Sequence, residues 1–143
     1  MTIKELSQLY YLKREIDMDK QRLNDLRQTA ASPSAPNLSG MPRGTQSECA
    51  LERKSIKIFE LEKLIEQKID RCNAEKIRLE KYIENIDDSL TRQIFTQRFI
   101  RCLSWRQVAH KVGGYNTAET VRQHCYRYLK KENLSQMSQI DVV

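Results

Sequence analysis

A seven-residue ladder of apolar side chains constrains the fold of this chain more than any other feature. Within residues 48–87 the ladder runs without a break. Its members are Leu51, Ile58, Ile65, Cys72, Leu79 and Ile86. A heptad repeat sustained over this length predicts one long helix with a coiled-coil seam. A strand cannot produce it, because side chains alternate between faces every second residue.

A second, shorter heptad seam lies near the N-terminus, over about residues 2–31. Leu9, Ile16 and Leu23 are seven residues apart, and Asp19 occupies one slot of the same seam. The simplest partner of the long helix is this first helix, folded back antiparallel, but the same helix in a second chain is an equally physical partner. The polar seam slots Lys54, Lys68 and Glu75 argue against a tight parallel zipper. We therefore expect a helical hairpin that also makes a homo-oligomer.

The segment between these two helices, residues 32–47, holds all three prolines and two of the four glycines of the 143-residue chain. Pro and Gly at this density interrupt any helix. We predict a loop here, so that residues 1–88 form one helical, oligomerising region.

The C-terminal part of the chain predicts three shorter helices. Asp87, Asp88 or Ser89 can cap a supporting helix over about residues 90–100. Ser104, with Gln107 three residues later, has the form of a capping box for the next helix. Gly113-Gly114 ends that helix, and Asn116, with Glu119 as its capping partner, opens the last one. Two short helices joined by a glycine turn predict a helix-turn-helix over residues 89–131, followed by a flexible tail at 132–143.

Charge is concentrated in this predicted domain. From Ser89 to Lys131 nine Lys or Arg residues face a single acid, Glu119, which gives +8, whereas the whole chain carries +6. A basic segment that coincides with a helix-turn-helix predicts binding to double-stranded DNA. Groove-reading side chains come from the start of the second helix. The base-reading candidates are Thr117, Ala118, Glu119, Thr120, Gln123 and Tyr126, and the phosphate-contacting candidates are Arg101, Arg106, Lys111, Arg122, Arg127 and Lys130.

Three of these candidates have an alternative that involves no DNA contact. Arg101 could be a solvated loop residue. Glu119 could serve only as the acid of the capping box. Tyr126 and Tyr128 could pack against the supporting helix, and for Tyr128 we favour that interpretation.

Other chemistry has little support in the sequence. His110 and His124 lie within basic helices, without a carboxylate or nucleophile at a useful spacing, so we expect no enzyme and no catalytic residue. The four cysteines form no CxxC pair, and we expect reduced, structural thiols with no metal and no cofactor. No apolar run reaches the length of a membrane span, and the first residues lack the core of a signal peptide. We expect a cytoplasmic protein that binds no membrane.

The stretch from about Leu90 to Lys131 resembles region four of housekeeping-type bacterial sigma factors. The resemblance rests on Gln97-Arg98-Phe99, on Ser104 to Val112 and on Val121-Arg122-Gln123. It implies that Glu119 and Gln123 read bases and that Arg122 contacts the DNA backbone. The turn at Gly113 to Thr117 is longer than the family's usual turn, and Ala118 stands where the family usually has an arginine.

A wider set of short motifs resembles a family of small sigma-like proteins encoded by phages and prophages of Gram-positive bacteria. Its members in this chain are Tyr10-Tyr11-Leu12, Ser32-Pro33-Ser34, Gly40-Met41-Pro42-Arg43-Gly44, Ile86-Asp87-Asp88, Ser104-Trp105, Gly113-Gly114, Asn116-Thr117 and Val121-Arg122. Related ArpU-type proteins are regarded as late-gene regulators. The helical patterns described above predict an all-α fold. The resemblance adds a regulator of phage late-gene transcription that acts in a bacterial host cell, docks at promoter DNA and touches RNA polymerase.

Two other functions fit the same pattern. A small terminase subunit, which recognises phage DNA for packaging, also combines a helix-turn-helix with an oligomerising coiled coil. An interaction protein that binds RNA polymerase through the coiled coil would need no DNA contact.

Overall fold

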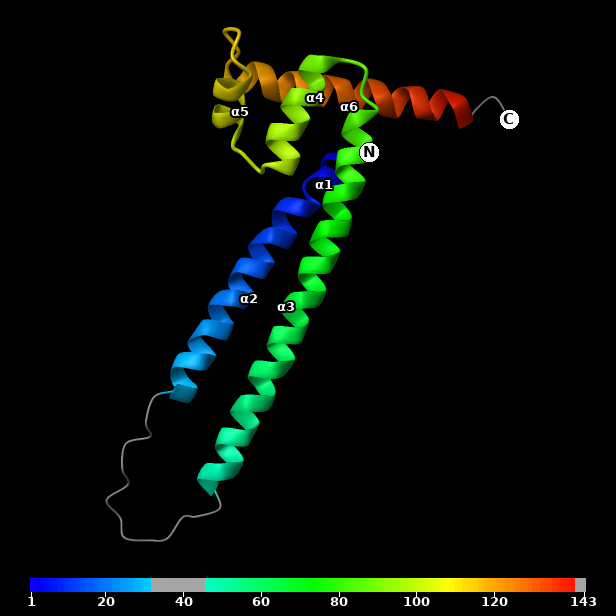
Figure 1. The fold of residues 1–143 in the computed structure, drawn as a ribbon. Coiled ribbons are helices and arrows are strands. Elements are labelled where there is room, and N and C mark those ends of the chain that lie inside the picture. Colours follow the sequence, from blue (N-terminus) through cyan, green and yellow to red (C-terminus); the bar gives the residue numbers. More distant parts are fainter. Residues whose placement is uncertain (32–45, 141–143) are drawn as a thin grey trace. The chain divides into compact units, whose positions relative to one another are not determined.

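The computed structural model describes residues 1–31 and 46–140. Every regular element in these residues is a helix, so the predicted all-α class is confirmed (Figure 1). The elements are α1 (Ile3–Leu6), α2 (Gln8–Ala31), α3 (Gln46–Glu84), α4 (Ser89–Phe95), the π-helical turn η1 (Thr96–Ile100), α5 (Trp105–Val112) and α6 (Ala118–Ile140). The predicted loop at 32–47 lies almost wholly outside the described residues, and α3 already begins at Gln46.

The chain divides into two compact units, and the division differs from the predicted boundary at residue 88. One unit comprises Lys13–Arg71, and the other comprises Met1–Leu12 together with Cys72–Val143. The first turns of the chain and the C-terminal part of α3 therefore belong to the same unit as α4, α5 and α6. Sequence periodicity could not reveal this, because α2 and α3 each run through the boundary without interruption.

The Lys13–Arg71 unit pairs α2 with α3. Leu23 packs with Leu61 and Ile65 in a small apolar cluster, which Leu26, Ile58 and Ile69 extend. Polar contacts follow the same register, because Asp19 pairs with Lys68 and Arg27 pairs with Glu62. Partner numbers fall along α3 as they rise along α2, so the two helices run antiparallel in this unit (Figure 1).

The predicted apolar ladder, whose last member Ile86 lies just beyond α3, is buried over only part of its length. Ile65, Cys72, Leu79 and Ile86 are buried, whereas Ile58 is half-buried and Leu51 is exposed. The described part of α2 ends at Ala31, before it reaches the level of Leu51. Two polar slots of the predicted seam have ionic partners, since Lys68 pairs with Asp19 and Glu75 pairs with Arg78.

The other unit has a core built from most of its helices. Leu6 and Leu9 come from α1 and α2, and Leu79 and Ile83 come from α3. Phe95 is fully buried and lies edge-on against both Phe99, at 5.3 Å between ring centroids, and Tyr128, at 5.6 Å. The aromatic rings thus join α4, η1 and α6 into one core. Burial of these apolar surfaces is the main stabilising contribution to such a unit.

Several predicted helix ends are shifted in the structure. The first helix is interrupted at Ser7, and α3 ends at Glu84 rather than near residue 87. The chain then tightens, as the N–H of Asn85 donates to Tyr82 and that of Ile86 donates to Ile83. Asp88 caps α4 by accepting the N–H of Thr91 at 2.8 Å, which identifies the cap among the three predicted candidates.

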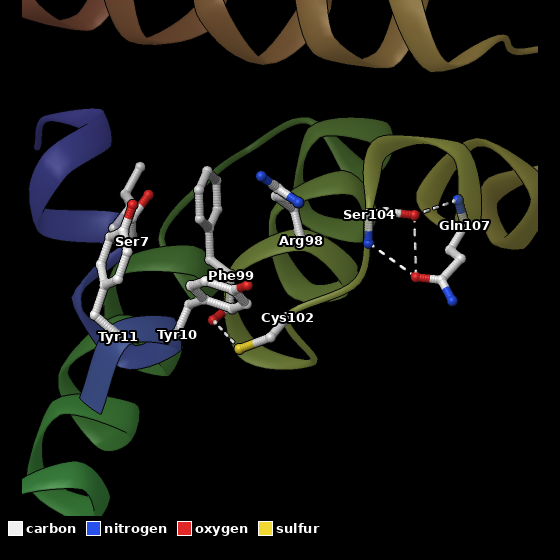
Figure 2. Close-up of a pocket in the computed structure, with 9 residues that line it drawn as sticks. Ser7, Tyr10, Tyr11, Arg98, Phe99, Cys102, Ser104 and Gln107 are labelled. Atoms are coloured by element: carbon white, nitrogen blue, oxygen red, sulfur yellow. Dashed lines mark hydrogen bonds between the residues drawn. The ribbon is translucent and has the colours of Figure 1, made fainter. Parts of the chain in front are cut away.

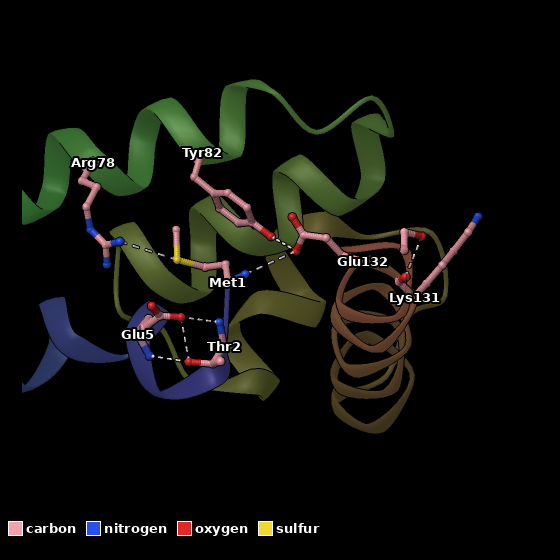
Figure 3. A network of polar contacts seen from close by, with 8 residues as sticks. Met1, Thr2, Glu5, Arg78, Tyr82, Lys131 and Glu132 are labelled. Atoms are coloured by element: carbon pink, nitrogen blue, oxygen red, sulfur yellow. Dashed lines mark hydrogen bonds and ion pairs between the residues drawn. The ribbon is translucent and has the colours of Figure 1, made fainter. Parts of the chain in front are cut away.

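The predicted tail at 132–143 is wrong for most of its length, because α6 continues to Ile140. Residues 132–140 contain neither Gly nor Pro, so a helix can propagate through them without an apolar stripe. Glu132 also accepts a hydrogen bond from the hydroxyl of Tyr82, which ties this part of α6 to α3 (Figure 3). Burial, followed by the hydrogen bond to Glu132, raises the pKa of Tyr82, so its hydroxyl stays protonated and donates.

Candidate nucleic-acid interface

The start of α5 has the capping box that the sequence predicts. The Ser104 hydroxyl accepts the N–H of Gln107, and the Gln107 side-chain oxygen accepts the N–H of Ser104 at 2.9 Å (Figure 2). Val108 and Ala109 are buried, while Trp105 is half-buried and carries the Arg98 guanidinium 4.6 Å from its ring centroid. This capping box and the buried face fix the direction of α5.

The turn between α5 and α6 uses three successive residues with positive φ: Gly113 at 71°, Gly114 at 67° and Tyr115 at 62°. Asn116 closes it by donating its side-chain N–H to the Gly113 carbonyl at 2.7 Å. The glycines end α5, as predicted, but Asn116 braces the turn instead of capping the next helix.

The capping residue of α6 is Thr117. Its hydroxyl accepts the N–H of Thr120 at 3.2 Å, and the Thr120 hydroxyl accepts the N–H of Thr117 at 2.8 Å. The predicted pair of Asn116 and Glu119 is therefore wrong. Thr117 is the N-cap residue, since its carbonyl also accepts the first helical hydrogen bond, from the N–H of Val121.

One face of α6 is buried in the core. Val121, Cys125 and Leu129 are buried, and burial raises the pKa of the Cys125 thiol to about 12. Tyr128 packs on Phe95, as we favoured, but Tyr126 is exposed, and the packing alternative for Tyr126 is wrong. The Arg122 guanidinium lies 5.9 Å from the Tyr126 ring centroid.

The base-reading candidates lie at the start of α6 and outside its buried face. Thr117, Glu119, Thr120, Gln123 and Tyr126 are exposed, and Ala118 is half-buried. Thr117 and Thr120 already use their hydroxyls in the cap described above. Glu119, Gln123 and Tyr126 are the three candidates whose side chains project from the first turns without a capping role.

Four exposed side chains on this face form a connected polar network. Glu119 accepts two hydrogen bonds from Arg122, at 3.0 and 3.2 Å, and one from the Gln123 amide at 3.0 Å. The Gln123 oxygen in turn accepts from Arg127 at 3.3 Å. These bonds, above all the one from Arg122, lower the pKa of Glu119, which is therefore charged at neutral pH. Glu119 thus holds Arg122 and Gln123 in place, in addition to being a base-reading candidate.

The phosphate-contacting candidates Arg101, Arg106, Lys111, Arg122, Arg127 and Lys130 are all exposed. Arg127 and Lys130 border one surface hollow on α6, together with Lys131. Arg106 and Lys111 border another on α5, together with His110. The structure therefore groups four of the six into two basic patches, one on each helix, and places Arg101 and Arg122 in neither.

Sequence reasoning missed two residues that shape this region. Arg98 donates to the Leu103 carbonyl at 2.7 Å and borders a hollow of about 340 Å³, with Tyr10, Tyr11 and Cys102 among its other neighbours (Figure 2). His124 lies 2.8 Å from the buried Thr91 hydroxyl and 3.6 Å from the Asp88 carboxylate. The Asp-x-x-Thr spacing from 88 to 91 was a readable signal for the cap, but the contact with His124 depends on tertiary packing.

The described residues contain no group of three or more His, Cys, Asp or Glu side chains that could hold a metal ion. Likewise, no helix within residues 1–31 and 46–140 combines the length and apolarity needed to cross a membrane.

Comparisons with protein-family models, with curated proteins and with solved structures found no match to this chain.

Proposed function

We propose that this chain is a sequence-specific regulator of transcription that binds double-stranded DNA through α6. The observation that carries the proposal is the exposed network of Glu119, Arg122, Gln123 and Arg127, which occupies the first turns of a helix that follows a capped α5 and a fixed turn. We interpret α5, the turn and α6 as a helix-turn-helix in which α6 is the recognition helix.

The side chains suit such a role chemically. A glutamine can bond adenine through two edge atoms, a glutamate can accept from cytosine, and arginine binds guanine or phosphate. Basic residues on α5 and farther along α6 would contact the backbone on either side of the groove, and such contacts make binding strongly dependent on salt.

The regulatory part of the proposal rests on the sigma-like motifs of the sequence. By that resemblance the protein is of phage origin, docks at promoters of late genes and contacts RNA polymerase.

The test begins with selection of bound sequences from random duplex DNA, followed by anisotropy titrations on the selected site at several salt concentrations. Replacing Arg122 and Arg127 by Ala should weaken binding at least about tenfold and lower the salt slope by about 2. The control replaces Lys20 and Arg22 by Ala, which removes the same charge from the exposed face of α2. No binding at low salt, or equal losses in the two variants, would refute the proposal.

The mass of the protein in solution distinguishes a packaging protein from a transcription regulator. A ring of eight or more chains would indicate a small terminase subunit, whereas a monomer or a dimer agrees with a regulator.

A further inference from the structure

Helix α3 carries a second apolar site that is separate from the stripe packed against α2. Ile56 is 50% exposed and Phe59 is 66% exposed, although Leu61 and Ile65 nearby are buried in the α2–α3 cluster. Ile56 and Phe59 are three residues apart and thus adjoin on the helix surface. Exposing a phenylalanine and an isoleucine side by side leaves apolar surface that a partner can cover.

Opposite charges flank this pair at equal spacing. Glu52 lies four residues before Ile56, and Lys63 lies four residues after Phe59, so all four side chains share one face of the helix. Glu52 and Lys63 are exposed, and neither forms an ion pair with any residue that the structure describes. By contrast, the neighbouring Glu62 and Lys68 are paired with α2.

The order acid, apolar, apolar, base is self-complementary under a two-fold axis. When two copies of α3 cross antiparallel between Ile56 and Phe59, Glu52 of one copy faces Lys63 of the other, twice. A parallel arrangement would instead place Glu52 beside Glu52 and Lys63 beside Lys63, which repel each other. The charges therefore favour a second copy of α3 as the partner, and they favour the antiparallel over the parallel orientation.

We propose that a second copy of this chain docks on the Glu52–Lys63 face of α3, in an antiparallel, two-fold arrangement centred on Ile56 and Phe59. The intrachain α2–α3 contacts stay intact in this dimer, because it uses a different face of α3. Only a few side chains form this contact, so we expect a weak dimer, with a dissociation constant on the order of 100 µM. It would form readily where two chains are held near each other.

The test is sedimentation equilibrium of the full chain from about 10 µM to about 1 mM, without DNA. The wild type should pass from monomer to dimer over this range, and Phe59→Glu should remain monomeric. Met18→Glu is the matched control, because Met18 is 68% exposed on α2 and lies outside the proposed face. Circular dichroism checks that both variants keep their helical content.

Charge reversal tests the direction of the dimer. Glu52→Lys alone and Lys63→Glu alone should each weaken association about tenfold. The double variant should return to the wild-type dissociation constant, because each reversed charge again faces its opposite. A monomeric wild type at 1 mM, equal effects of Phe59→Glu and Met18→Glu, an oligomer larger than a dimer, or a double variant no stronger than the single ones would overturn the proposal. None of these outcomes depends on whether the chain binds DNA.

Discussion

At the scale of single residues, the contacts around Asp88 link the cap of α4 to α6. The carboxylate accepts the N–H and the hydroxyl of Thr91, and the same hydroxyl lies 2.8 Å from the His124 ring. Thr91 is buried although it is polar, and these partners satisfy its hydroxyl. The cap of α4 thereby holds His124 of α6, which is the neighbour of the base-reading candidate Gln123.

Asp88 should make the stability of the protein depend on acid. The Thr91 donors, and to a smaller extent His124, lower the pKa of this carboxyl in the folded state. The ionised form therefore favours folding above the ordinary pKa of about 3.9, and this contribution is lost as the pH falls through the lowered value. In Asp88→Asn, which keeps a capping side chain, unfolding should depend less on pH below about pH 4.

Urea titrations of the wild type and the variant from about pH 5 to about pH 2 measure this difference. Asp87→Asn removes the same charge one residue earlier and serves as the control. If both variants change the pH dependence of the free energy of unfolding equally, the effect is caused by the loss of net charge and not by the loss of the ionised cap.

At the scale of elements, the junction of α5 and α6 depends on which residue caps the second helix. The structure assigns the cap to Thr117, with Thr120 as its reciprocal partner, and leaves Glu119 to bind Arg122 and Gln123. The cap and the polar network are therefore separable by mutation.

Thr117→Ala should lower the free energy of unfolding by about 1 kcal/mol, because α6 loses an acceptor for its first N–H groups. Glu119→Ala should change stability much less, since its bonds are made on the exposed face. Chemical denaturation of both variants measures the contrast. If Glu119→Ala is the more destabilising change, the capping pair predicted from the sequence is correct after all.

At the scale of the whole molecule, the partly buried pair of Asp19 and Lys68 helps to set the register of α2 against α3. Hydrogen bonding to Asp19 raises the pKa of Lys68, so the Lys68 ammonium stays charged throughout the neutral range. Both residues occupy seam positions that apolar side chains would otherwise fill, a common way of fixing register at a cost in stability.

Lys68→Met should destabilise the protein by about 1–2 kcal/mol, because it leaves a partly buried Asp19 without its partner. Replacing Asp19 and Lys68 together by Leu should restore or exceed the wild-type stability, since the seam then packs apolar side chains throughout. Thermal unfolding measures both, with Lys57→Met as the control, because Lys57 is an exposed lysine of the same helix. A double variant less stable than Lys68→Met would contradict this account of the seam.

Local chemistry in the sequence was sufficient to predict the all-α class, the long second helix, the Ser104–Gln107 capping box and the buried side of α6. Each of these depends on the spacing of residues within one or two helical turns. The cap of α6 by Thr117 is also made with near neighbours, Thr120 and Val121, but the adjacent Asn116 is an equally suitable residue type and was predicted wrongly. Tertiary structure alone decided that Glu132 joins α6 to α3, that His124 contacts Asp88 and that the chain divides within α2 and α3. These features depend on contacts between residues far apart in the sequence, and helical periodicity carries no record of such contacts.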